Sequence, residues 1–231
     1  MTNPSIPSPI KEIGDQNFPI WLLGDSPSDS PSAKGQNLTP LDPRHPTRHS
    51  IWTPISDVIQ RRLFVRYGRR LDDSELYIRN AVSNSDYKKK KHNEKLDKEI
   101  VELRELLNRD NKPKPLLVLC FGQYAFEYAR RAQEEGDERH PKKWPTEELG
   151  QQFNKRILNV QLGEVTLLPL LHQYVALQFP KSHDGFSGTG SNYYEFVGEK
   201  IAKALIDLIE NDTENRMDKF LLRGKQEGVA S

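Results

Sequence analysis

Four short apolar runs of the sequence are each followed by a residue that could take part in chemistry. The first run leads into the stretch GDSPSDS, which offers a carboxylate at Asp25 and a hydroxyl at Ser26. The carboxylate could activate a water molecule and the serine could be a nucleophile, whereas the simpler alternative is a polar turn. The other three runs lead to an amide, a glycine and an imidazole, at Asn80, Gly122 and His172.

The apolar runs themselves predict buried strands. They cover residues 19–23, 76–82, 115–121 and 165–171, and they are rich in Leu, Val and Ile. Apolar residues on both alternating faces, as in the third and fourth runs, are typical of a parallel sheet covered on both sides. Ligands of such sheets bind beyond the carboxyl ends of the strands, so we expect the four residues to meet at one edge. Taken singly, each residue also has a structural explanation: the Asn80 side chain could hydrogen-bond to backbone groups at the strand end, and His172 could be a histidine of the core.

Helical periodicity between the runs completes the predicted architecture. Helices are expected over residues 53–68, 93–110, 123–136 and 192–210, the first starting at Thr53-Pro54 and stopping at Gly68. This alternation predicts an α/β fold, a three-layer α/β/α domain with a central four-stranded parallel sheet. The domain is expected over residues 18–215, after an extended arm (1–17) and before a C-terminal tail (216–231). Residues 137–145 are expected to form a surface loop.

Composition narrows the class of protein. The chain has 231 residues with 34 basic and 33 acidic side chains, a net charge of +1. A globally basic nucleic-acid binder is therefore not indicated, although a local basic patch is compatible with this balance. The single cysteine, Cys120, lies in an apolar run and is expected to be a buried small hydrophobe. No membrane span or signal peptide is apparent, so a cytoplasmic protein is expected. The protein is also expected to be a monomer.

In their order along the chain, these motifs resemble those of the uracil-DNA glycosylase superfamily from about residue 18 to 210. LLGDSPS is similar to the superfamily's Gly-x-x-Pro-Gly loop, and LYIRNAV ends its strand at an asparagine, Asn80, that reads the base. The third run, KPKPLLVLCFGQYAFEYA, matches a Leu-Gly-x-x-Ala motif through Gly122 and Ala125. The last, LPLLHQYVAL, carries His172 where relatives have His-Pro-Ser. The resemblance implies a uracil-DNA glycosylase-like fold.

Departures from the superfamily pattern change what is expected of the site. The iron–sulfur cysteines are missing, so neither a cluster nor another metal or cofactor is expected. Ser26 stands directly before the proline, where some branches carry a catalytic Asp or Asn, and Asp25 lies one residue earlier. Asp29 is a second acidic candidate in the same loop. Gln173 and Tyr174 replace the proline and serine after the histidine, so a modified pyrimidine is as plausible a substrate as uracil.

The resemblance implies a monofunctional DNA glycosylase that hydrolyses the N-glycosidic bond of a flipped-out base and leaves an abasic site. Asp25 would orient water and stabilise the positive sugar, while His172 would donate a hydrogen bond to the departing base. The amide of Asn80 would read the edge of a pyrimidine. Repair and defence against modified phage DNA are both compatible roles.

Other positions are expected to bind substrate or DNA. The loops after the strands contribute substrate-binding residues, namely Gly24, Ser26, Pro27, Asp29 and Gly122. An aromatic ring would stack on the base, with His49 and Trp52 as candidates, although Trp52 could equally be core. Residues after the histidine could fill the vacated base stack: Tyr174, Val175 and Leu177. A lysine run could bind the backbone of double- or single-stranded DNA, or be a solvated surface: Lys88, Lys89, Lys90 and Lys91.

Two alternatives remain open. A Gly-Asp-Ser esterase or hydrolase would use Ser26 as its nucleophile, but it needs an Asp-x-x-His element before the last helix. The sequence has His183 and Asp184 adjacent and in the reverse order, so the triad is not obtained by simple transfer. A glycosylase-like module that binds DNA without cleaving it is the other alternative.

Overall fold

The computed structural model describes residues 12–27, 46–89, 94–110, 112–136, 138–178, 185–186, 192–214 and 217–221. A five-stranded mixed sheet forms its centre, with the order β1-β3-β2-β4-β5. The strands are β1 (Glu12–Ile13), β2 (Ile20–Gly24), β3 (Tyr77–Asn80), β4 (Leu117–Phe121) and β5 (Thr166–Leu170). The last four are mutually parallel. The predicted α/β class is confirmed, and each predicted run overlaps one strand.

The edge strand β1 was not predicted. It pairs antiparallel with β3 and belongs to the segment expected to be an extended arm. Two residues are too few to show alternation, so the pairing depends on contacts made elsewhere. The hydroxyl of Tyr77 donates to the carboxylate of Glu12 at 2.5 Å. Gly14, at φ +87°, lets the chain approach Leu76 so closely that a Cβ would lie 2.1 Å from its carbonyl oxygen.

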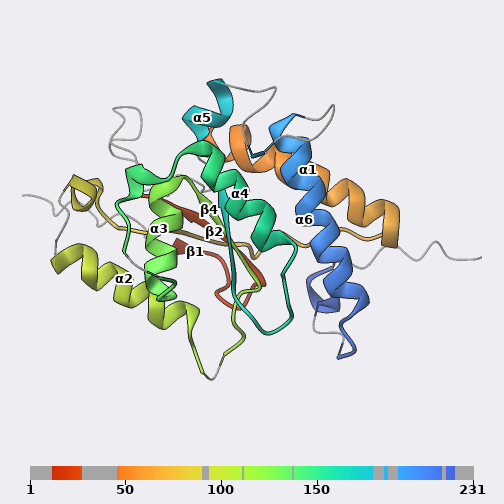
Figure 1. Cartoon of the computed structure of the whole chain (residues 1–231). Coiled ribbons are helices and arrows are strands. Elements are labelled where there is room, and N and C mark those ends of the chain that lie inside the picture. The colour runs from red at the N-terminus through yellow and green to blue at the C-terminus, as the bar shows by residue number, and fades with distance from the viewer. Residues whose placement is uncertain are drawn as a thin grey trace, which may run out of the picture.

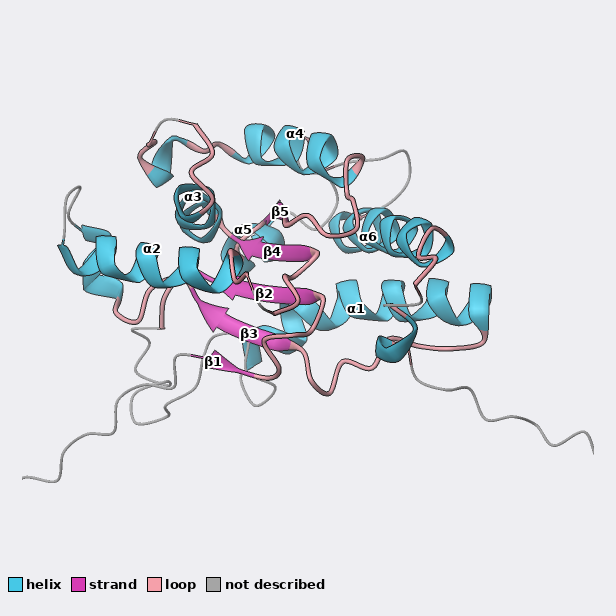
Figure 2. Ribbon diagram, turned by 90° about the horizontal axis from the view of Figure 1, so that it is seen from below, coloured by secondary structure: helices cyan, strands magenta, loops and turns pink. Residues whose placement is uncertain are grey.

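Helices cover both faces of the sheet (Figure 1), with α2 and α3 on one side and α1 and α6 on the other. Their bounds are α1 (Pro46–Tyr67), α2 (Glu94–Leu107), α3 (Gln123–Ala132), α4 (Thr146–Ile157), α5 (Gln173–Gln178) and α6 (Tyr193–Glu210). Short 3-10 turns are η2 (Ser85–Lys89), η3 (Pro141–Lys143) and η4 (Asp218–Phe220). Figure 2 shows β4, β2 and β3 side by side in the middle of the molecule.

The strands and the inner helix faces form one continuous core. Every residue of β2, β3 and β4 is buried, as the uninterrupted apolar runs predicted. Cys120 in β4 is fully buried, and burial raises the pKa of its thiol, which agrees with the interpretation as a small hydrophobe. The helices α1 and α6 pack closely at Gly198, where a Cβ would lie 2.6 Å from the Cβ of Val58.

The predicted start of the first helix is wrong. Residues 46–52 already belong to α1, and Pro54 lies inside it. Proline lacks the N–H that would bond to the preceding turn, so it is common in the first turn of a helix. The pair Thr53-Pro54 therefore has the sequence pattern of a helix start although it lies inside α1. The side chains of Ile51, Trp52 and Ile55 are all buried, and their packing holds the helix together across the proline.

Two further segments are more ordered than expected. The predicted loop 137–145 contains η3 and buries Trp144, and α4, which was not predicted, follows directly. The predicted tail contributes Met217 and Leu221 to the core, and Leu221 forms an isolated bridge with Leu71. Among the described helices, none is both long and apolar enough to cross a membrane.

Candidate functional site

A pocket of about 270 Å³ lies at the carboxyl ends of the parallel strands. Five of its lining residues are among those singled out in the sequence, namely Asp25, Gly122, His172, Tyr174 and Val175. The others come from α3, α4 and the segments that precede α4 and α5, namely Gln123, Tyr124, Trp144, Thr146, Leu149 and Leu171. The pocket therefore combines one carboxylate and one imidazole with three aromatic side chains, Tyr124, Trp144 and Tyr174, and several apolar side chains.

Strand register brings the carboxylate, the glycine and the imidazole to one edge. Asp25 directly follows β2, and Gly122 directly follows β4. The neighbouring ends of β4 and β5 are aligned, and the N–H of Gly122 donates to the carbonyl of Leu170 at 2.8 Å. His172 follows two residues later. The predicted convergence at the carboxyl edge therefore holds for these three residues.

A glycine is required at position 122 because of the backbone conformation there and because His172 lies close by. Its φ of +99° with ψ of 167° is a conformation that side-chain-bearing residues rarely adopt. A Cβ at this position would lie 3.2 Å from the Cβ of His172 and 3.5 Å from its Cδ2. The glycine thus lets the histidine lie directly against the start of α3.

His172 stands at the start of α5 with its imidazole exposed. Its carbonyl accepts from the N–H groups of Val175 and Ala176, both at 3.0 Å. Its Nδ1 accepts from the N–H of Tyr174 at 3.3 Å. Because Nδ1 is the acceptor, the neutral ring carries its proton on Nε2. The imidazole can therefore donate one hydrogen bond to a ligand in the pocket.

Asp25 is half-buried and lines the pocket together with Gln123 and Tyr124 of α3. Its Oδ1 accepts from the hydroxyl of Ser26 at 3.1 Å. Burial raises the pKa of Tyr124, and the negative charge of Asp25 raises it further. Burial also raises the pKa of Tyr128, one turn further along α3. The negative charge of Asp25 adds to this rise, whereas the charge of Arg131 opposes it. The carboxylate of Asp25, in a pocket that Tyr124 also lines, can hold a water molecule or a developing positive charge.

Asn80 is not among the residues that line this pocket. It ends β3 beside Gly24, where a Cβ would lie 2.6 Å from its Oδ1. The preceding residue, Arg79, approaches the carboxylate of Glu102 on α2 to 3.6 Å. Side chains alternate along a strand, so Asn80 points to the opposite face, which α1 and α6 cover. It is 1% exposed, and neither its Nδ2 nor its Oδ1 has a hydrogen-bond partner in the described structure.

The remaining predicted residues lie around the edge or in the core. Ser26 is buried, Pro27 is half-buried, and neither lines the pocket. Trp52 is 1% exposed within the core, as its structural alternative required, and its indole N–H has no partner in the described structure. His49 is exposed in the first turns of α1. Other predicted residues or side chains lie outside the described ones: Asp29, Lys90, Lys91 and the side chains of Lys88, Lys89 and Leu177.

Sequence reasoning missed part of the pocket. Tyr124 lies two residues after Gly122, so its position after a strand end could have suggested it. Trp144 lies in a predicted loop and Thr146 directly follows it. Both are more than 20 residues along the chain from each of the four predicted strand ends. Only the path of the chain through α3 and η3 brings them to the pocket.

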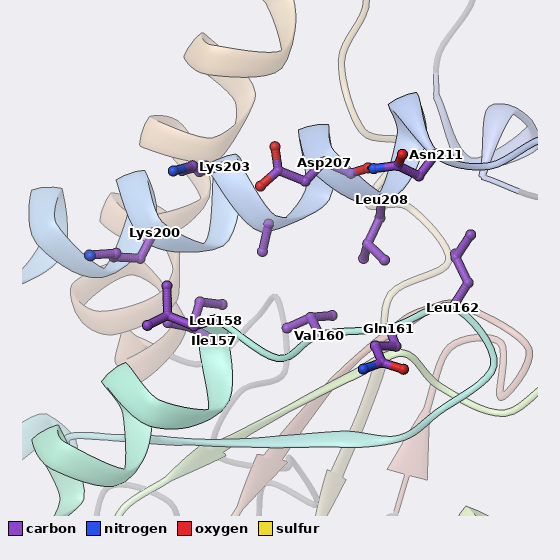
Figure 3. A pocket seen from close by; sticks show the side chains of 11 residues that line it. Ile157, Leu158, Val160, Gln161, Leu162, Lys200, Lys203, Asp207, Leu208 and Asn211 are labelled. Atoms are coloured by element: carbon purple, nitrogen blue, oxygen red, sulfur yellow. The ribbon is translucent and has the colours of Figure 1, made fainter.

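A second pocket, of about 350 Å³, lies between the C-terminal half of α6 and the segment that follows α4 (Figure 3). Leu158, Val160, Leu162 and Leu208 contribute apolar side chains, and Lys200 and Asp207 are charged. Residues 158–162 precede β5, so this pocket lies at the amino ends of the strands. It has no histidine and a single carboxylate, and it therefore offers less chemistry than the first pocket.

Neither protein-family models nor curated proteins give a match to this chain. In the described part of the structure, no group of three or more His, Cys, Asp and Glu side chains could hold a metal ion.

Proposed function

We propose that this chain is a monofunctional DNA glycosylase that releases a uracil-like or modified pyrimidine base. One observation carries the proposal. The carboxylate of Asp25 and the Nε2–H donor of His172 line the same pocket at the carboxyl edge of a parallel sheet. Their order along the chain is the one that the resemblance to uracil-DNA glycosylases implies. The sheet with its four parallel strands also supports this fold-level analogy.

The two groups have complementary tasks in hydrolysis of an N-glycosidic bond. As the bond between the sugar carbon and the base nitrogen breaks, the sugar becomes positive and the base negative. Asp25 stabilises the sugar and orients the water that adds to it. His172 donates a hydrogen bond to the departing base. The water forms the new bond to the sugar carbon and gives up one proton, which the base anion takes up. The base must first be rotated out of the stack, at a cost of a few kcal/mol in stacking and pairing.

The proposal assigns Asn80 to recognition of the base. Its buried amide lacks partners in the described structure, and an unpaired buried polar group costs about 1–3 kcal/mol. A pyrimidine edge has the donors and acceptors that would complete it. Since Asn80 points away from the pocket face, this contact requires the base to lie across the strand ends or the strand ends to rearrange.

DNA is the proposed partner of a monomeric, cytoplasmic enzyme without a cofactor. Tyr174 lies on the pocket and is 66% exposed, a placement that suits contact with a duplex. Val175 beside it is half-buried and could support the same contact as an apolar wedge. Base release from single- and double-stranded substrates measures the strand preference, and release of uracil rather than a modified base favours repair over defence.

Base release tests the proposal directly. The protein is incubated with single- and double-stranded DNA that contains uracil or a modified pyrimidine, and abasic sites are then cleaved with hot alkali. We expect alkali-dependent cleavage at the modified position and intact strands without alkali. Asp25→Asn, which preserves an acceptor for the hydroxyl of Ser26, is expected to lose this activity. Base release from none of the substrates, or equal release by Asp25→Asn, would overturn the proposal.

The esterase alternative has less support from the geometry. The hydroxyl of Ser26 donates to Asp25, whereas a nucleophilic serine donates to the base that activates it. Ser26 is also 4% exposed and does not line the pocket. His183 and Asp184 lie outside the described residues. Hydrolysis of a chromogenic ester that Ser26→Ala abolishes would favour this alternative. DNA binding without base release would favour the non-catalytic module.

A further inference from the structure

A fully buried carboxylate, Glu127 on α3, lies outside the acid–base pair of the proposed mechanism. It accepts hydrogen bonds from two arginines of its own helix, Arg130 at 3.0 and 3.2 Å and Arg131 at 3.0 Å. It also accepts from the backbone N–H of Arg139 at 2.8 Å and from the indole Nε1–H of Trp144 at 2.9 Å. One side chain thus joins α3 to both ends of the segment that leads into α4.

The charge of Glu127 is held in place by these donors. Burial by itself would raise its pKa, but the hydrogen bonds from Arg130, the Arg139 backbone, Trp144 and Arg131 outweigh burial and lower the pKa. The group is therefore a carboxylate at neutral pH. A buried carboxylate that is already fully hydrogen-bonded is not available for proton transfer at neutral pH.

Trp144 is fixed from several sides by the same network. The guanidinium of Arg139 lies over its ring, 4.3 Å from the centroid, and also pairs with the carboxylate of Glu148 on α4. Phe126 packs edge-on, with the ring centroids 5.0 Å apart. Because the indole N–H already donates to Glu127, the ring offers the pocket apolar surface and no hydrogen bond.

We propose that Glu127 is a positioning residue that holds Trp144 as a rigid, non-hydrogen-bonding wall of the pocket. The wall would contact the flat or apolar part of a ligand, while Asp25 and His172 contact its polar part. This inference deepens the proposed function and uses the same pocket. It can be tested separately from the proposed function, because Glu127 would affect the affinity for the ligand and not the rate of bond cleavage.

The test compares Glu127→Gln with Glu99→Gln. Glu99 is also a buried carboxylate near a buried arginine, Arg79 at 4.0 Å, but it belongs to α2 and does not line the pocket. Both variants remove a negative charge from a buried network, so loss of stability alone affects both. We expect Glu127→Gln to raise the KM for base release about tenfold, the loss from one weakened stacking contact, and to leave kcat within about twofold. Glu99→Gln should change neither.

Hydrogen exchange provides a second measurement that needs no substrate. In Glu127→Gln, amides of residues 138–146 should exchange faster while those of β4 and β5 keep their protection. If the wild type binds DNA without releasing a base, the Kd for the same oligonucleotides replaces KM. The proposed function then fails while this inference is still tested. Unchanged KM or Kd in Glu127→Gln, an equal rise in Glu99→Gln, or a wild type that binds no oligonucleotide would each overturn the inference.

Discussion

Gly122 and His172 lie against each other at the ends of two neighbouring parallel strands, with only 3.2 Å between a Cβ built on the glycine and the Cβ of the histidine. Gly122→Ala would therefore strain the backbone and push the imidazole aside. We expect a loss of about 1–3 kcal/mol in the free energy of unfolding, from the φ of +99°. Base release should fall at least about tenfold because the histidine moves. Urea unfolding and the base-release assay measure the two effects.

Gly68 provides the control for backbone strain. It also has a positive φ, +64°, but a Cβ there would meet nothing within 4 Å. Gly68→Ala should lose stability without losing base release. Normal activity in Gly122→Ala would show that the histidine does not depend on this close approach.

The role of His172 can be separated from its role in starting α5. Asparagine is a good residue for the first position of a helix and can accept the N–H of Tyr174 in place of Nδ1. His172→Asn should therefore keep its unfolding free energy within about 0.5 kcal/mol, since the side chain is exposed. Loss of the Nε2–H donor should lower kcat about 10²- to 10⁴-fold. A variant with wild-type kcat would remove His172 from the proposed mechanism.

Replacing Asn80 by leucine should abolish activity without lowering stability. Its amide is buried without partners, so Asn80→Leu should leave the unliganded protein as stable as the wild type or more stable. Base release should be lost because the pyrimidine edge is no longer read. The urea midpoint and the base-release assay again report the two outcomes.

Asn154 is the matched control for a paired amide. Its Nδ2 donates to the carbonyls of Gly150 at 3.0 Å and Gly185 at 2.6 Å. Asn154→Leu should lose about 1–3 kcal/mol, because two carbonyl groups lose their donor. Equal destabilisation by Asn80→Leu would mean that the Asn80 amide has partners in solution.

Glu127 should govern part of the acid stability. Its pKa is lowered from 4.5 in the folded protein, so it binds a proton less readily there than in the unfolded chain. The resulting stabilisation is present in full above the unfolded pKa and is lost as the pH falls through the folded one. The difference in unfolding free energy between wild type and Glu127→Gln should therefore be constant above about pH 5.5 and shrink below pH 4.5. Urea titrations at several pH values measure it, and a difference that does not vary with pH would contradict the assignment.

Short segments were difficult to predict because their structure depends on distant partners. The strand β1 pairs with β3, and its Glu12 accepts a hydrogen bond from Tyr77, 65 residues away. The segment before α4 is ordered because Trp144 and Arg139 reach back to Glu127 on α3. Neither contact leaves a local pattern in composition or periodicity.

The sequence by itself determined the four parallel strands, most of the helices and the edge at which Asp25, Gly122 and His172 meet. Apolar runs with both faces buried allow few alternatives, and parallel strands must present their carboxyl ends together. The tertiary structure alone decided which side chains share a pocket. Asn80 and Asp25 are both near strand ends, but alternation along the pleat directs Asn80 to the α1–α6 face. Tyr124 and Trp144 complete the pocket because α3 and the segment after it fold back over the strand ends.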